Sequence, residues 1–234
     1  MKIKTNHKRY IESSEGTIRI EFSEGHYYEN AFLINMNFAY RKLNNKKFKH
    51  IGGAELYAYV GSVYIFEDIF YHDICHWEHD LVNKIWDFEN QNYKKNYEKF
   101  QDIIDDDMVF SLDNFQLIPE FRGKRMFKQI IDEFQNMYPF GTIILKPYPL
   151  GLDIDDKKKF TITMKKIKQS YKNCGFKPID IEKEFYYLNI PQKVNVVQKN
   201  KDFFKQNTIL WTFYHLEHFQ EIIKDERKNE KHRR

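Results

Sequence analysis

Alternating apolar and polar positions near the start of the chain predict strands. Residues 17–22 alternate strictly, and residues 31–36 form a short apolar run. Residues 50–64 are rich in β-branched and aromatic side chains and carry three glycines, where a bulge or turn is expected. These three segments predict an N-terminal meander of strands.

The pattern changes to helical spacing between residues 66 and 104. Apolar residues recur there every third or fourth position, with polar residues between them. The positions on this rhythm are Ile74, Trp77, Leu81, Lys84, Ile85 and Phe88. Three consecutive aspartates, at positions 105–107, close the region. We interpret them as a solvated turn rather than as a cation site.

Strands and helices alternate in the second half of the chain. We expect strands at residues 108–118, 142–146 and 184–190, helices at residues 127–137 and 160–173, and a polar loop at residues 151–159. Gly175 stands where the glycine that ends a helix belongs. This order predicts an α/β (α+β) domain.

A further amphipathic segment follows Pro191. Ile209, Phe213, Leu216, Gln220 and Ile223 fall on one helical stripe. We therefore predict one domain over residues 1–190 and a C-terminal helical extension over residues 191–234. The extension either packs on the domain or contacts a partner, for example in a homodimer.

Composition and charge narrow the class of protein. Of 234 residues, 41% are hydrophobic and 17% aromatic, which argues for a packed core despite the 31% that are charged. The net charge is only +4, from 38 basic and 34 acidic residues that are mostly interleaved. Nucleic-acid binding is therefore not expected, and we interpret the basic tail at 227–234 as a solvated helix end.

The cysteines and apolar runs bear on the compartment. Cys75 and Cys174 are the two cysteines, too few for a disulfide framework, so a reducing compartment is the simpler assumption. The polar N-terminus does not look like a signal peptide, and no apolar run approaches the ~20 residues that span a membrane. We expect a cytoplasmic protein without a membrane partner.

The turn between the predicted strand 108–118 and the following helix is a candidate anion site. A glycine-bearing turn into a helix leaves backbone N–H groups unpaired, and the helix dipole adds positive charge beside them. The basic residues around this turn are Arg122, Lys124, Arg125 and Lys128. From these residues alone, an exposed basic start of a helix remains the alternative.

Two motifs in order resemble the GNAT (N-acetyltransferase) superfamily. Residues 118–124, Ile-Pro-Glu-Phe-Arg-Gly-Lys, match the acyl-coenzyme A signature, and residues 171–176, Tyr-Lys-Asn-Cys-Gly-Phe, match the second signature. Residues 143–149 fall at the position of the family's splayed strand. The resemblance implies a mixed, mostly antiparallel sheet of six or seven strands flanked by helices, with the acyl-coenzyme A core at residues 108–176.

The resemblance also implies an activity and roles for residues. It implies transfer of an acetyl group from acetyl-CoA to an amine acceptor that we cannot identify. Leu117 and Ile118 would pair with the pantetheine arm through their backbone. The pyrophosphate would lie on the turn and helix start formed by Arg122, Gly123, Lys124, Arg125, Met126, Phe127 and Lys128.

The chemistry needs an acid and a base. Tyr171 occupies the family's tyrosine position and is the candidate general acid, with a purely structural core tyrosine as the alternative. For the base, Asp113 and Glu55 lie on predicted strands, and an ordered water is a third candidate.

The match departs from the family at three positions. Arg125 and Phe127 stand where glycines are usual, and Met164 stands near the position of a usual asparagine. Glycines allow close approach of the pyrophosphate. A non-catalytic GNAT-fold binding or regulatory module is therefore the alternative function, and an acyltransferase with a longer acyl chain or another acceptor atom is a third.

One further motif has metal-ligand spacing. His72, His76 and His79 would share one face of a helix. The residue after the first histidine is Asp73, not the glutamate of metalloproteases, and no third ligand motif follows. We interpret these as ordinary surface histidines and predict no metal site.

Overall fold

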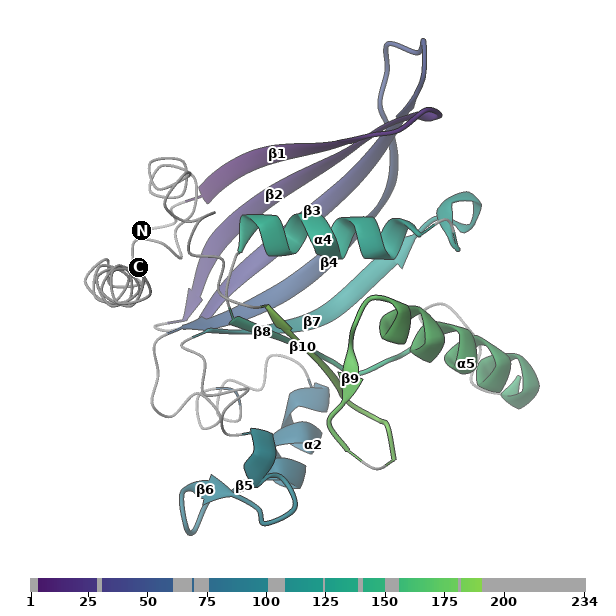
Figure 1. The fold of residues 1–234 in the computed structure, drawn as a ribbon. Helices are drawn as coiled ribbons and strands as arrows, with labels where there is room; N and C mark the ends of the chain where they lie inside the picture. The colour runs from purple at the N-terminus through teal and green to yellow at the C-terminus, as the bar shows by residue number, and fades with distance from the viewer. Residues whose placement is uncertain are drawn as a thin grey trace, which may run out of the picture.

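An eight-stranded sheet forms the centre of the protein in a computed structural model (Figure 1). The structure describes residues 4–28, 31–60, 69, 76–100, 108–123, 125–138, 141–149, 156–180 and 182–190. Its strands are β1 (Lys4–Glu12), β2 (Gly16–Tyr28), β3 (Ala31–Lys42), β4 (Lys49–Val60), β7 (Met108–Leu117), β8 (Gly141–Leu145), β9 (Lys177–Pro178) and β10 (Tyr186–Ile190). The spatial order is β1-β2-β3-β4-β7-β8-β10-β9.

The sheet is antiparallel with one exception. Strands β1 to β4 form a continuous meander, and β4 pairs antiparallel with β7. Strand β8 lies parallel to β7, and β10 and β9 then complete the sheet in antiparallel pairs. The parallel pair requires a crossover, which the helix between β7 and β8 supplies. The predicted mixed, mostly antiparallel sheet and N-terminal meander are confirmed.

Helices α4 (Met126–Met137) and α5 (Lys157–Asn173) lie on one face of the sheet. We call it the α4 face; Ile34, Leu56 and Phe110 project there and pack with Ile130 and Phe134 of α4. The opposite side is the α2 face, where helix α2 (His76–Ile85) packs against Tyr59, Val109 and Ile144. Figure 1 shows α4 lying across the meander and α2 near β5 and β6.

Local signals explain the helix ends. In α4 the buried residues recur on one stripe, namely Met126, Ile130, Ile131, Phe134 and Met137. The Asp156 carboxylate accepts the N–H of Lys159 and caps the start of α5. At its end, the N–H of Gly175 bonds to Lys172 O and the N–H of Phe176 to Tyr171 O, with Gly175 at φ +94°. The prediction that Gly175 ends this helix is confirmed.

The region 66–104 differs from its prediction. Helix α2 ends at Ile85 and is followed by a two-stranded sheet of β5 (Trp86–Asp87) and β6 (Asn92–Tyr93) and a 3₁₀ turn, η1 (Glu98–Phe100). Asp87 Oδ1 accepts the N–H groups of Glu89 and Asn90, which fixes a turn that competes with the helix. The helical prediction is therefore confirmed for residues 76–85 and wrong for residues 86–97, and residues 101–104 lie outside the described residues.

Other boundaries also shift. Strands β2, β3 and β4 differ in length from the predicted segments, and β1 and β9 were not predicted, so the main sheet has eight strands instead of six or seven. Helix α5 begins at Lys157, inside the predicted loop 151–159. The extension 191–234, residues 105–107, His72 and Cys75 lie outside the described residues. Among described helices, none is long and apolar enough to cross a membrane.

Candidate functional site

Strand β7 continues beyond the end of its parallel neighbour. Pairing with β8 runs only from Val109, opposite Thr142, to Leu112, opposite Leu145. On its other side β7 stays paired with β4 as far as Leu117. From Asp113 to Leu117, therefore, the outer edge of β7 has no strand partner in the described part of the chain.

The alternation of backbone hydrogen bonds along β7 shows which backbone groups face this free edge. The N–H of Ile118 bonds to Ile51 O at 2.9 Å, on the β4 side. Because antiparallel residues alternate between bonding to one neighbour and the other, the amide groups of Phe115 and Leu117 face away from β4. They lie along the edge that β8 leaves.

A β-bulge at Asp113 sets the direction of the side chains beyond it. Glu55 lies opposite Asn114 and Leu56 opposite Leu112, so Asp113 is the extra residue. After the bulge, the side chains of Asn114 and Gln116 lie on the α2 face. Phe115 and Leu117 pack with the core on the α4 face.

The turn after β7 has the predicted shape. A 3₁₀ turn, η2 (Pro119–Phe121), leads through Arg122 and Gly123 to Arg125 and the first residue of α4. Arg125 has φ +58° and ψ 11°, a left-handed conformation that glycine favours, and it makes no side-chain cap. The Arg125 side chain therefore does not cap the first N–H groups of α4. An anion site at a helix start requires such uncapped N–H groups.

Basic side chains surround the turn. Arg122 and Arg125 are exposed, and Lys128 is exposed and bonds to Asp132 at 2.9 Å. Arg122 Nε donates to Leu117 O at 2.8 Å, so one carbonyl of the free edge already has a partner. The remaining guanidinium N–H groups of Arg122 are left for an anion. The side chain of Lys124 lies outside the described residues.

Phe127 points into the protein and not across the outer surface of the turn. Its ring centre lies 4.7 Å from that of Phe115, 5.0 Å from Tyr171 and 6.2 Å from Phe176. The ring therefore joins β7, α4 and α5 in one aromatic cluster. Its backbone stays at the helix start, while its ring lies beside the free edge of β7.

Tyr171 belongs to this cluster. It packs against Phe127, Phe176 and Tyr186, and its hydroxyl has no hydrogen-bond partner among the described residues. Burial raises the pKa of Tyr171 well above its usual range, and the neighbouring Cys174 thiol adds to this. Burial likewise raises the pKa of Cys174 to about 11. The Tyr171 hydroxyl is thus a neutral donor at physiological pH.

The side-chain amide of Asn114 bonds to both candidate bases, Glu55 and Asp113. Asn114 Nδ2 donates to Glu55 Oε2 at 3.2 Å and to Asp113 Oδ2 at 3.0 Å. Trp77 of α2 donates its Nε1–H to Asp113 Oδ1 at 3.3 Å. The structure therefore brings Glu55 and Asp113 together at the bulge, where the free edge of β7 begins.

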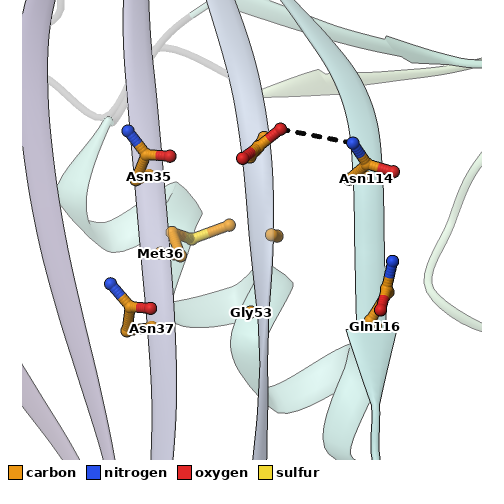
Figure 2. A pocket seen from close by; sticks show the side chains of 8 residues that line it. Asn35, Met36, Asn37, Gly53, Asn114 and Gln116 are labelled. Atoms are coloured by element: carbon orange, nitrogen blue, oxygen red, sulfur yellow. Dashed lines mark hydrogen bonds between the residues drawn. The ribbon is translucent and has the colours of Figure 1, made fainter.

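A polar hollow opens on the α2 face beside these carboxylates (Figure 2). Its volume is about 200 Å³, and its lining residues are Asn35, Met36, Asn37, Gly53, Ala54, Glu55, Asn114 and Gln116. Figure 2 shows Asn35 and Asn37 along β3 and Asn114 and Gln116 along β7, with Gly53 on β4 between the two rows. We call this the carboxamide hollow.

The structure places most of the predicted cofactor-binding residues in one segment, and it reveals further polar residues nearby that were not predicted. Leu117, Ile118, Arg122, Gly123, Arg125, Met126, Phe127 and Lys128 lie along one segment from the end of β7 to the first turn of α4, with Met126 buried in the core. The four carboxamides of the hollow were not predicted. Their signal in the sequence was faint: the patterns Asn-x-Asn at 35–37 and Asn-x-Gln at 114–116 place amides where strands usually alternate other polar residues.

Among the described residues, no group of three or more histidines, cysteines or carboxylates could hold a metal ion. The side chain of His76 and all of His72 lie outside those residues.

Comparisons of the chain with protein-family models, with curated proteins and with solved structures found no match.

Proposed function

We propose that the protein is a GNAT-like acyltransferase that moves an acetyl group from acetyl-CoA to an amine. The observation that carries the proposal is the end of β7. A strand with an unpaired edge from Asp113 to Leu117 leads directly into a basic turn and the start of α4. The edge offers amide groups to the amides of a pantetheine arm, and the turn offers N–H groups and cations to the pyrophosphate.

The backbone at Arg125 supports the same proposal. This residue stands where the superfamily usually has a glycine, and its φ of +58° is one that glycine adopts without strain. The turn thus has the glycine-type conformation although its residue is arginine. The Arg125 side chain is exposed and adds a cation to the anion site.

The proposed reaction is a direct attack. The amine nitrogen attacks the thioester carbonyl, the C–N bond forms, and the C–S bond breaks. The amine proton passes to the carboxylate pair of Glu55 and Asp113, directly or through a water. The leaving thiolate takes a proton from the neutral hydroxyl of Tyr171.

A second candidate function rests on specific contacts. Arg122 occupies the carbonyl of Leu117, and the Phe127 ring lies against Phe115 beside the free edge. Both reduce the room and the hydrogen-bonding capacity available to a pantetheine arm. A GNAT-like module that binds an acyl-CoA or another anion without turnover is therefore the alternative.

Calorimetric titration with acetyl-CoA and coenzyme A tests both candidates. We expect acetyl-CoA binding that weakens as salt rises, because the contacts to phosphate are ionic. Arg122→Ala should weaken binding by about tenfold or more, the effect of one charge-assisted hydrogen bond. Arg122→Lys keeps the charge but not the planar guanidinium, so its affinity should lie between those of Arg122→Ala and the parent. The control is Lys172→Ala, on the exposed side of α5, which should bind acetyl-CoA like the parent.

The outcomes separate the candidates. Binding with thiol release in the presence of an amine panel supports the enzyme. Binding without thiol release supports the module. If the folded protein binds no coenzyme A derivative, both candidates are wrong.

A further inference from the structure

The carboxamide hollow has a regular layout that follows from the sheet register. Glu55 is flanked by Asn35 on β3 and Asn114 on β7, and Gly53 is flanked by Asn37 and Gln116. The carboxamides therefore form two parallel walls with β4 as the floor (Figure 2). Within each wall the two residues are two positions apart, so their spacing is about 7 Å along the strand.

These dimensions match an extended peptide. Strands in a sheet lie about 4.8 Å apart, so a chain lying over β4 is about 4.8 Å to the side of each wall. An extended peptide presents an N–H and a C=O to the same side at every second residue, with the same repeat of about 7 Å. Asn35, Asn37 and Gln116 each offer one donor group and one acceptor, as a neighbouring peptide group does. The amide of Asn114 already donates to Glu55 and Asp113, so it offers only its acceptor oxygen.

Strand β4, the floor of the hollow, allows a peptide backbone to lie close to the sheet and determines which end of the peptide lies at Glu55. Gly53 has no side chain, so a backbone lying over it reaches the height of the wall carboxamides. The next residue on this face of β4 is Glu55, whose carboxylate closes that end and bonds only to Asn114 among the described residues. Away from Glu55 the floor leads toward the exposed His50. The closed end is therefore anionic, and the other end is open.

From this layout we propose that the carboxamide hollow binds the amino terminus of a peptide. Its ammonium lies at Glu55, and its first peptide groups lie between the two carboxamide walls. The proposal deepens the acetyltransferase proposal and rests on it only for the reaction, because it names the acceptor class. Polyamines fit less well, since they carry donors only and leave the carboxamide N–H groups unpaired. Aminosugars lack the 7 Å repeat of peptide groups.

Binding is tested first without acetyl-CoA, using trialanine as the probe in calorimetric and NMR titrations. We expect trialanine to bind and N-acetyl-trialanine to bind at least about tenfold more weakly, because the acetylated peptide loses the charge-assisted contact to Glu55. Amide signals of Gly53 and Glu55 should shift with trialanine. Absence of trialanine binding, shifts confined to other regions, or tighter binding of glucosamine or spermidine would overturn the proposal.

Wall variants give a second test. Asn37→Leu and Gln116→Leu remove one carboxamide each from opposite walls while nearly keeping side-chain size, and both positions are exposed. Each should weaken trialanine binding by about threefold to tenfold, the range of one neutral hydrogen bond, and leave acetyl-CoA binding unchanged. Asn136→Leu, on α4 behind the sheet, is the matched control and should bind both like the parent. Equal trialanine affinity in wall variants and control contradicts the proposal.

The two proposals fail in different ways. If acetyl-CoA binds and trialanine does not, the acceptor assignment is wrong and the acetyltransferase proposal stands. If trialanine binds at Gly53 and no coenzyme A derivative binds, the hollow is a peptide site and the acetyltransferase proposal is wrong.

Discussion

Arg125 holds the backbone in the left-handed region immediately before α4. For a residue with a side chain this conformation costs about 1 kcal/mol, and for a β-branched residue more. We expect Arg125→Gly to be as stable as the parent within about 1 kcal/mol, and Arg125→Val to be less stable than Arg125→Gly by about 1–2 kcal/mol. Urea unfolding of the three proteins measures this difference. Equal midpoints for the glycine and valine variants would show that the turn tolerates another backbone conformation.

The ring of Tyr171 packs against neighbouring aromatic side chains, while its hydroxyl has no hydrogen-bond partner among the described residues. Removing the hydroxyl therefore tests its chemical role without disturbing the packing. Tyr171→Phe should therefore change the free energy of unfolding by less than about 0.5 kcal/mol. If Tyr171 is the general acid, the same change should lower kcat by about 100-fold, with little change in KM.

The pH profile provides an independent check on Tyr171. Its pKa is raised, so the hydroxyl remains protonated throughout the range in which enzymes are ordinarily assayed. An alkaline decline of activity between about pH 8 and 10 should therefore persist unchanged in Tyr171→Phe. A decline that disappears in the variant would assign the titration to Tyr171 and contradict the raised pKa.

At the scale of elements, the contact of β4 with β7 depends on a close approach at Gly52. A Cβ atom at this position would lie 2.1 Å from Gln116 O, and the residue has φ +155°. Gly52→Ala must push the two strands apart and should destabilise the protein by at least about 2 kcal/mol. Gly25→Ala is the matched control, because nothing lies within 4 Å of its added Cβ. Thermal unfolding of both variants should show a loss only for Gly52→Ala.

The elements that the sequence predicted well are those with a clear apolar pattern, on one side of a helix or on both sides of a buried strand. The helix at 126–137 has one continuous buried stripe, and β7 has a clear run of buried residues. Strand β1 was missed because its sequence, Lys-Thr-Asn-His-Lys-Arg-Tyr-Ile-Glu, is mostly polar, as an edge strand permits. The helix after 66 was extended too far because the apolar spacing continues to Phe88, while the Asp87 turn overrides it.

The candidate site divides in the same way. The turn and helix start were predictable because their residues are contiguous, so a local motif contains them. The carboxamide hollow draws its walls from β3 and β7, about 80 positions apart in the chain, and from β4 between them. Only the register brings these side chains together, and the register depends on pairings and bulges that a single sequence does not specify.

At the scale of the whole molecule, one ion cluster joins helix α2 to the segment between β9 and β10 at the end of the sheet. Lys84 of α2 contacts Asp180, Glu182 and Glu184 at 2.9, 3.0 and 3.1 Å, in the segment between β9 and β10. The Asp180 side chain is fully buried and also accepts the N–H groups of Glu184 and Phe185. Helix α2 is thereby held to the strands that follow α5.

This cluster predicts a pH-dependent stability. Burial on its own would raise the pKa of Asp180, but the hydrogen bond from Lys84 and those from two backbone N–H groups lower it below its ordinary value. The stabilisation is therefore present above about pH 4 and is lost as the pH falls through the lowered pKa. Asp180→Asn should reduce the free energy of unfolding by about 2 kcal/mol at pH 7, and by clearly less at pH 3.

Urea unfolding at both pH values measures the effect. The matched control is Asp80→Asn, because Asp80 pairs with Lys146 at the same distance of 2.9 Å but is 63% exposed. An exposed pair contributes at most about 1 kcal/mol, so this variant should differ little from the parent at either pH. A loss for Asp180→Asn that is the same at pH 7 and pH 3 would contradict the ionic origin.

The extra residue at Asp113 reverses the parity of β7. Before it the even-numbered Phe110 and Leu112 face the core, and after it the odd-numbered Phe115 and Leu117 do. If the same residues were paired with β4 without the bulge, those two side chains would turn to the open face, and Asn114 and Gln116 would turn inward. The amides that face a ligand and the rings that hold α4 would exchange places. One inserted residue therefore separates the surface that can recognise a molecule from the surface that keeps the protein folded.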